Sequence, residues 1–250
     1  MTLRRLLFAG LTFIFLVALA CFWSRCGAVA VNLEPERVVA ARPRAEALLR
    51  RKCQELGLAY PPRQLFLRVF KAERLLEAWV REGEEPYRCL AVWPVLAASG
   101  QPGPKRREGD LQVPEGCYQI VVFNPRSSFH LSLGLDPNAS DRHRSDPERP
   151  GFDIYLHGGG ASIGCVAIGD EGIEELYILA RDITDRAKQP IPVHLFPAHM
   201  KGEPWTTIRR EHPQHAEFWS ELKPIYQGFQ QTHLLPHITI GPTGEYRLTP

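Results

Sequence analysis

A histidine and a cysteine separated by a glycine-rich segment are the residues of this sequence best suited to covalent chemistry. The segment 154–170 reads IYLHGGGASIGCVAIGD, and seven residues lie between His157 and Cys165. A thiolate is a strong nucleophile, and a neighbouring imidazole raises its population near neutral pH. The pattern therefore indicates an acyl transfer in which Cys165 is the nucleophile and His157 is the general base.

The small residues between the pair suit the same chemistry. Gly164 has no side chain that would keep backbone amides away from an oxyanion developing during acyl transfer. Three further glycines can adopt positive φ and let a substrate backbone pass closely, namely Gly158, Gly159 and Gly160. Ser162 can donate a hydrogen bond to a substrate or hold the loop itself.

The residues alone leave three other interpretations of this segment open. The histidine and cysteine could be buried structural residues. The glycines could form a phosphate loop, although the Lys-Ser or Lys-Thr that ends such a motif is absent. The pair could also bind zinc, for which a third ligand could come from His143, His194 or His199.

The elements that position the pair are expected to form a β-rich domain. Runs of apolar and alternating residues between turns predict strands at 64–70, 87–96, 118–123, 129–133, 152–156 and 191–196. The strand at 152–156 would deliver His157 at its end, and a hairpin-like return would place Cys165 opposite. Apolar side chains on one face predict a helix over 170–181. A doubly wound parallel sheet is not expected, because strands and helices do not alternate regularly.

Helical patterns flank this domain. Residues 43–57 predict a short amphipathic helix with proline near its start and glycine at its end. Aromatic side chains at helical spacing predict a second helix over 215–231, and Gly-Pro-Thr-Gly at 241–244 predicts a hairpin. We expect a helical linker at 31–62, a catalytic domain at 63–200 and a packed α/β extension at 201–250.

The N-terminal segment predicts export. Arg4 and Arg5 precede 18 residues without a charge, the pattern of a signal peptide or a membrane anchor. We expect residues 1–30 to be such a segment, and the rest of the chain to lie in the periplasm or cell envelope. If it is not cleaved, the segment would also attach the protein to the membrane.

Composition argues against several functional classes. The chain is 44% hydrophobic and 23% charged, as in ordinary globular proteins. Lysine and arginine total 30 against 28 acidic residues, and a net charge of +2 argues against nucleic acid as a partner. The 6 cysteines include no C-x-x-C pair, so they predict no metal centre. Any disulfide among Cys53, Cys89 and Cys117 cannot be assigned from the sequence.

The order His-Gly-x-x-x-Ser-x-Gly-Cys resembles the signature of the L,D-transpeptidase catalytic domain, the YkuD superfamily. Further stretches resemble its YafK-type murein transpeptidase branch in the same order, at 70–71, 75–79, 103–105, 109–118, 124–125, 131–132 and 170–179. The resemblance covers about residues 63–200. It implies a mainly β, antiparallel YkuD-like fold with a few helices.

The resemblance also implies a reaction on peptidoglycan stem peptides without a metal or other cofactor. The cysteine would attack the carbonyl of the L-centre of the third, diamino residue and release the D-residue that follows. An amine would resolve the thioacyl-enzyme to a crosslink, or water would hydrolyse it. By matched position, the carbonyl of Gly158 would orient the imidazole of His157. The amides near Gly164 and Cys165 would form the oxyanion hole.

One departure concerns the position two residues after the cysteine, where many members have arginine and this sequence has Ala167. A guanidinium that could clamp a carboxylate is missing there. Partial replacements could come from Lys71, Lys105, Arg106 and Arg107, although such a basic run is also typical of a solvated loop.

We therefore expect an L,D-transpeptidase whose partners are stem peptides and a second peptide or protein linked through the stem. One alternative is a hydrolase of the same bond class, either an L,D-carboxypeptidase or an amidase that releases a stem-peptide-linked group. Another is a catalytically silent peptidoglycan-binding module.

Overall fold

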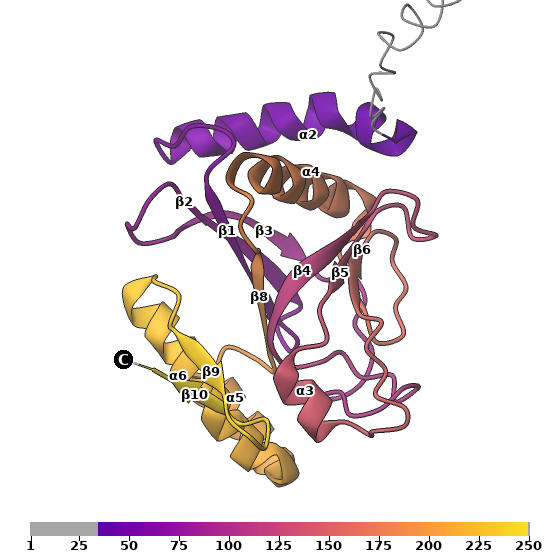
Figure 1. Cartoon of the computed structure of the whole chain (residues 1–250), viewed down its shortest axis with the longest axis vertical. Helices are drawn as coiled ribbons and strands as arrows, with labels where there is room; N and C mark the ends of the chain where they lie inside the picture. The colour runs from indigo at the N-terminus through magenta and orange to yellow at the C-terminus, as the bar shows by residue number, and fades with distance from the viewer. Residues whose placement is uncertain (1–34, 250) are drawn as a thin grey trace, which may run out of the picture. The chain divides into compact units, whose positions relative to one another are not determined.

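A curled sheet of eight strands forms the centre of the fold in the computed structural model, which describes residues 35–249 (Figure 1). The strand order is β3-β2-β1-β8-β4-β5-β6-β7. In chain order the strands are β1 Gln64–Phe70, β2 Leu75–Arg81, β3 Arg88–Pro94, β4 Gly116–Asn124, β5 Ser132–Leu135, β6 Tyr155–His157, β7 Val166–Ala167 and β8 Pro192–Phe196. Neighbours pair antiparallel except at β1–β8 and β6–β7. The expected β-rich, mainly antiparallel fold is thus confirmed, with several helices around it.

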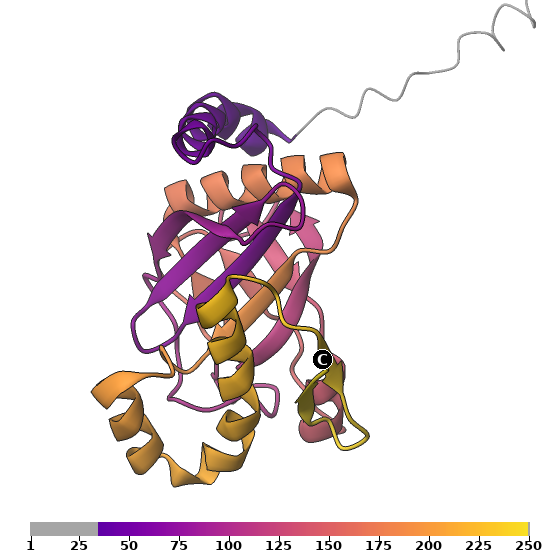
Figure 2. The same cartoon turned by 90° about the vertical axis from the view of Figure 1, so that its left-hand side faces the viewer.

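Two long helices cover one face of this sheet. They are α2 Glu36–Glu55 and α4 Gly169–Ala187, which lie side by side in Figures 1 and 2. The inward face of α4 carries Ile173, Leu176 and Ala180, all fully buried as the 3.6-residue spacing requires. Arg42 of α2 donates to the carboxylate of Asp182 at 3.0 Å and ties the helices together.

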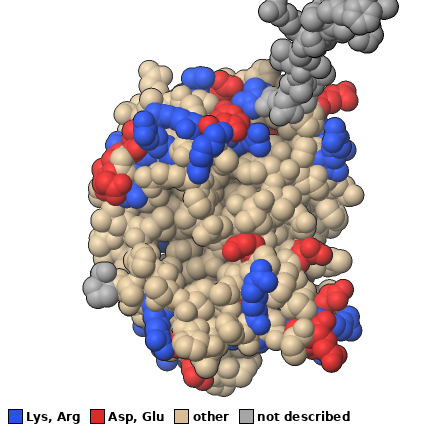
Figure 3. Space-filling model, in the orientation of Figure 1, with Lys and Arg blue, Asp and Glu red and all other residues tan. Residues whose placement is uncertain are grey.

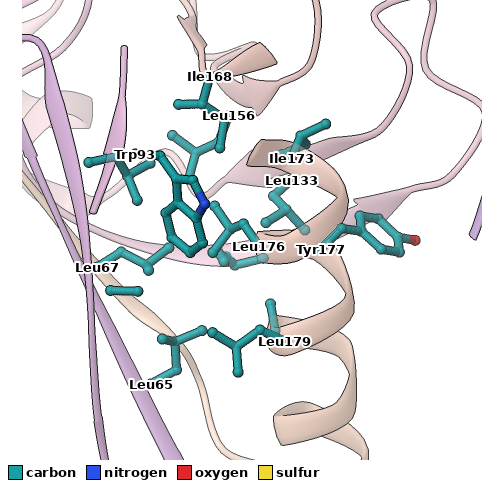
Figure 4. Close-up of a cluster of buried hydrophobic side chains, with 14 of the residues drawn as sticks. Leu65, Leu67, Trp93, Leu133, Leu156, Ile168, Ile173, Leu176, Tyr177 and Leu179 are labelled. Atoms are coloured by element: carbon teal, nitrogen blue, oxygen red, sulfur yellow. The ribbon is translucent and has the colours of Figure 1, made fainter. Parts of the chain in front are cut away.

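The main hydrophobic cluster anchors both ends of the loop that carries the candidate site. Leu156 precedes His157 and Ile168 follows β7, and Figure 4 shows both beside Trp93 among buried apolar side chains. Burying a leucine of this kind stabilises the fold by about 1.5–3 kcal/mol. The two loop ends are therefore fixed by packing.

The C-terminal segment covers the opposite face of the sheet (Figure 2). It contains α5 Gly202–Glu211, a 3-10 turn Pro213–His215, α6 Ala216–Thr232 and the hairpin β9 Ile238–Ile240 with β10 Tyr246–Leu248. Trp219, Leu222 and Tyr226 of α6 pack with Phe70 and Phe196 of the sheet. A short helix, α3 Ala139–Arg144, lies between β5 and β6 in sequence.

Most strand predictions are confirmed, and the errors have local causes. The strands expected at 129–133 and 152–156 begin three residues later, at Ser132 and Tyr155. Arg37 donates to the carbonyls of Ser127 and His130, which holds the preceding segment in a turn. Strand β2 was not expected as a separate element, although its burial alternates along its length.

The helix expected at 43–57 begins earlier, at Glu36, so that prediction was wrong at its N-terminal end. An interior proline such as Pro43 costs a helix about 3 kcal/mol. Burial of Val38, Ala41 and Ala45 on one stripe offsets that cost. Short helices α3 and α5 were also not expected.

The signal or anchor segment expected at 1–30 lies outside the described residues. Within residues 35–249, no helix is both long enough and apolar enough to cross a membrane. Basic side chains gather over α2 on the face seen in Figure 3, whereas the middle of that face is largely uncharged.

Candidate active site

His157 and Cys165 lie in or directly beside two short paired strands, with Cys165 level with Tyr155, two residues before His157. His157 is the last residue of β6, and Cys165 directly precedes β7. These strands are parallel, with Leu156 opposite Val166 and His157 opposite Ala167. The predicted hairpin-like return was therefore wrong: the loop 158–164 crosses back so that both strands run in the same direction.

The two side chains border one cavity of about 270 Å³. Its walls are formed by Asn124, Ser127, Ser128, Phe129, Ser132, Tyr155, His157 and Cys165. These residues supply hydroxyls, an amide and an aromatic ring, but none is a lysine or arginine. The cavity can accordingly accept and donate hydrogen bonds around the thiol without offering a fixed cation.

The imidazole of His157 is held in one tautomer. Its Nδ1 lies 2.6 Å from the carbonyl oxygen of Gly158. A carbonyl only accepts hydrogen bonds, so Nδ1 carries the proton and Nε2 has the free lone pair. The ring is 3% exposed and packs against Phe129, with centroids 4.7 Å apart. Burial lowers the pKa of His157 and the bond to Gly158 opposes this, so the ring is neutral and basic near neutral pH.

The thiol of Cys165 is protonated in the resting state. Burial raises its pKa, while a backbone hydrogen bond from Tyr155 and the charge of Lys105 act in the opposite direction. The negative charge of Asp153 raises it further. The Sγ atom lies 3.8 Å from the carbonyl oxygen of Asp153. A thiol in this environment needs a base before it can attack a carbonyl group.

The amides expected to form an oxyanion hole are bonded to hydroxyl groups. Ser162 Oγ accepts from the amide of Cys165 at 2.9 Å and donates to the carbonyl of the same residue at 2.6 Å. Ser99 Oγ accepts from the amide of Gly164 at 2.6 Å and donates to the carbonyl of Leu111 at 2.7 Å. Sequence reasoning missed Ser99, because 65 residues separate it from its partner.

The remaining loop glycines differ in their surroundings. Gly158 is enclosed: a Cβ there would lie 2.6 Å from Asp170 Oδ1 and 2.8 Å from the carbonyl oxygen of Phe129. Gly159 has φ of 70° and donates its amide to Asp170 Oδ1 at 2.8 Å. Gly160 is exposed, with open space where a Cβ would be. Asp170 is therefore a further residue at the loop to which sequence reasoning gave no role.

The basic residues considered as replacements for a missing arginine are mostly engaged elsewhere. Lys71 forms a buried ion pair with Glu115 at 2.9 Å, so it cannot act as a substrate clamp. Lys105 pairs with Asp110 at 2.7 Å and Arg106 with Asp141 at 3.2 Å, while Arg107 is exposed. Lys105 and Arg106 are thus half-buried and paired, whereas Arg107 is solvated.

Ala167 itself does not border the cavity. It is fully buried, and its backbone bonds to that of Ala97 in an isolated bridge.

The histidines considered as zinc ligands lie apart from the pair. His194 is buried among Phe66 and Phe196 on the sheet face covered by α6, and His143 is exposed on α3. His199 stacks on Phe70 just beyond β8. Over the described part of the chain, no group of three or more His, Cys, Asp or Glu could hold a metal ion. The described cysteines, Cys53, Cys89, Cys117 and Cys165, are free thiols.

Comparison with known proteins identifies the family of the chain. The family model of the YkuD L,D-transpeptidase catalytic domain matches residues 65–194. YafK of Escherichia coli (strain K12) is 30% identical over 179 residues, which cover 70% of each chain. The chain belongs to the L,D-transpeptidase catalytic domain (YkuD) family. The resemblance seen in the sequence is thereby confirmed.

Solved structures of similar proteins align over parts of the chain. A point mutant of the helical cell shape determining protein Pgp2 of Campylobacter jejuni has a TM-score of 0.44 and 18% identity, covering 65% of this chain and 56% of Pgp2. L,D-transpeptidase 1 of Mycobacterium tuberculosis has a TM-score of 0.32 and 12% identity, covering 53% of this chain and 62% of its own. This YkuD-family chain therefore spans less than two thirds of either solved protein.

Proposed function

We propose that this YkuD-family protein transfers acyl groups of peptidoglycan stem peptides through a thioester on Cys165. The observation that carries the proposal is the hydrogen bond between His157 Nδ1 and the carbonyl of Gly158. It leaves Nε2 as the basic nitrogen of a ring that borders the same cavity as the thiol. A neutral imidazole that borders the same cavity as a protonated thiol is a resting state suited to general-base activation.

The proposed reaction has two steps. His157 Nε2 takes the proton from Sγ, and the thiolate attacks the carbonyl carbon of the third stem residue. The C–N bond to the following D-residue breaks, and the imidazolium returns the proton to the leaving amine. An incoming amine or water then attacks the thioester while His157 removes its proton. Sγ leaves as a thiolate and is reprotonated.

The amides of Gly164 and Cys165 are proposed to bind the oxyanion of each step. Both are bonded to hydroxyl oxygens in the resting state. A developing oxyanion is a stronger acceptor than a neutral hydroxyl, because hydrogen bonds to ionised groups are roughly twice as strong. The oxyanion can therefore displace Ser99 and Ser162 from the amides as charge builds up.

Hydrolysis is the second candidate outcome, and the composition of the cavity wall favours it. Crosslinking requires an acceptor amine to be held at the thioester, and such positioning is worth roughly 7–11 kcal/mol. The described wall contains no lysine or arginine that could clamp the carboxylates of a second peptide. Water needs no such clamp. We therefore propose that trimming or release of a stem-linked group competes strongly with crosslinking.

The proposal extends to domain organisation and location. Residues 63–200 would form the catalytic domain, with 31–62 as a helical linker and 201–250 as a packed extension. The segment 1–30 would export or anchor the chain, so the enzyme would meet its substrate in the periplasm or cell envelope.

The test is incubation of the full-length protein with purified peptidoglycan, followed by mass spectrometry of the released and crosslinked peptides. We expect Cys165→Ala and Cys165→Ser to lose at least about a hundredfold in turnover, because neither can supply a thiolate. Cys89→Ala is the matched control, since Cys89 is a free, exposed thiol. Unchanged turnover in Cys165→Ala would refute the proposal.

Supplying acceptor peptide in excess over donor separates the two outcomes. A product consisting almost entirely of crosslinked peptide would remove the case for hydrolysis. Absent turnover together with retained binding of purified peptidoglycan would instead support a silent binding module.

A further inference from the structure

The peptide group that orients His157 is itself held by a carboxylate. The carbonyl of Gly158 accepts from His157 Nδ1 at 2.6 Å. The amide of Gly159 donates to Asp170 Oδ1 at 2.8 Å. The C=O of residue 158 and the N–H of residue 159 belong to one planar amide. A single peptide group thus links the carboxylate of Asp170 to the imidazole.

We infer that Asp170 is a positioning residue for His157, acting through the Gly158–Gly159 peptide group. This inference rests on the proposed role of His157 as general base. A carboxylate that accepts a hydrogen bond from the N–H of a peptide group polarises that group. The polarisation increases the negative charge on the carbonyl oxygen of the same peptide group. Hydrogen bonds in a chain strengthen one another in this way by about 10–30% each. The carbonyl becomes a better acceptor for Nδ1–H, which fixes the tautomer and makes Nε2 more basic.

The surroundings allow this peptide little freedom. The amide of Gly158 donates to the carbonyls of Phe129 at 3.0 Å and Leu131 at 3.2 Å. A Cβ on Gly158 would collide with Asp170 Oδ1, so only glycine permits the carboxylate to approach the peptide so closely. Glycine is therefore required at position 158 for the approach of Asp170, in addition to any access that it gives to substrate.

The carboxylate does not cap the helix on which it lies. Asp170 is the second residue of α4, where a carboxylate commonly bonds to free helix amides. The N-terminus of α4 nevertheless has no side-chain cap. The helix instead holds Asp170 in a fixed position from which its carboxylate reaches the loop. The next turn of the helix is anchored in the core by Ile173 and Leu176.

Other charges near the pair must be controlled in any test. The titratable or charged groups around it are Asp153 and Tyr155 on the strand side, Lys105 from the β3–β4 loop, His130 with its partner Glu174, and Arg37 and Arg44 from α2. Glu171 offers a matched control, because it is exposed and adjacent to Asp170 on the same helix.

The experiment is an NMR titration of ¹⁵N-histidine-labelled full-length protein in a Cys165→Ala background, which removes coupling to the thiol. The chain has 9 histidines, so the His157 signals are assigned by their loss in His157→Gln. We expect Asp170→Asn, which keeps an acceptor oxygen but loses the charge, to lower the pKa of His157 by roughly half to one unit. Asp170→Ala should in addition mix the two tautomers. Glu171→Gln should change neither.

Activity provides the second readout, with Cys165 intact. Asp170→Asn should lower kcat by about tenfold with little change in KM, because the substitution weakens the general base His157 and leaves the substrate contacts in place. An unchanged tautomer and pKa in Asp170→Ala, with only a lower Tm, would overturn the inference and leave Asp170 a purely structural residue. The titration does not depend on turnover. A shifted pKa in a protein inactive on peptidoglycan would therefore retain this link and reject the proposed function.

Discussion

Ser99 Oγ lies 2.6 Å from the amide nitrogen of Gly164, one of the two amides proposed to bind the oxyanion. The serine belongs to the segment after β3, whose backbone pairs with β7 through Ala97 and Ala167. The same hydroxyl also donates to Leu111, so it joins two parts of the β3–β4 connection to the catalytic loop. Under the proposed mechanism, the oxyanion would have to replace this neutral acceptor at the Gly164 amide.

Removal of that acceptor should speed acylation. In Ser99→Ala the amide of Gly164 no longer has to exchange a partner, and a typical net hydrogen bond is worth about 0.5–1.5 kcal/mol. We expect the rate of thioester formation to rise by roughly two- to tenfold and the Tm to fall by a few degrees. Stopped-flow acylation with a stem tetrapeptide measures the rate, and Ser220→Ala on α6 is the control. A slower rate of thioester formation would mean that Ser99 holds the Gly164 amide in its productive orientation instead of blocking it.

Arg37 does not line the cavity of His157 and Cys165, but we expect it to affect catalysis there. Its guanidinium donates to the carbonyls of Ser127 and His130, both at 2.7 Å, and so holds the segment that presses Phe129 against His157. We expect Arg37→Ala to reduce kcat/KM several-fold, corresponding to about 1 kcal/mol. Arg51→Ala, at an exposed position of the same helix, should leave it unchanged. Equal losses in both variants would show that only the stability of α2 matters.

Local patterns in the sequence were sufficient for most strands and for singling out His157 and Cys165. Alternation identified β1, and the apolar stripe identified α4, because these signals depend on neighbours within a few residues. The motif around His157 and Cys165 was visible because seven residues separate the two chemical groups.

What the sequence could not provide lies in pairing between distant segments. The parallel register of β6 and β7 depends on how the loop 158–164 crosses back, and glycines allow either direction. Ser99 reaches Gly164 across 65 residues, and no local pattern marks it. Lys71 looked available for substrate, because a charge alone does not reveal that Glu115 is buried beside it.

That buried pair should be important for stability. Lys71 Nζ bonds to Glu115 Oε1 at 2.9 Å, and Glu115 Oε2 accepts from Trp219 of α6 at 2.7 Å. Lys71→Met leaves a buried carboxylate without its cation, a change that typically costs about 3–5 kcal/mol. We expect a loss of that size in urea unfolding, whereas Lys201→Met at an exposed position should have little effect. A loss below about 1 kcal/mol would show that Trp219, the amide of Gly103 and water satisfy the carboxylate without Lys71.

The last prediction concerns acid stability and His194. Burial lowers the pKa of this histidine from its usual 6.5 to about 3, and the charge of Arg68 acts in the same direction. In the unfolded chain the ring takes up a proton below about 6.5, whereas in the folded protein it stays neutral until the pH approaches 3. Protonation therefore favours the unfolded state, so the stability that His194 contributes is complete above 6.5 and is lost as the pH falls.

His194→Phe separates this effect from those of other groups. A phenyl ring suits the contacts with Phe66 and Phe196 and cannot be protonated. Three other histidines with lowered pKa values, His157, His199 and His215, remain in the variant and act in the same direction. We expect the free energies of unfolding in urea at pH 7 and pH 5 to differ less in His194→Phe than in the wild type, by an amount on the order of 1–2 kcal/mol. Identical pH dependence in the two proteins would mean that His194 takes up a proton as readily in the folded protein as in the unfolded chain.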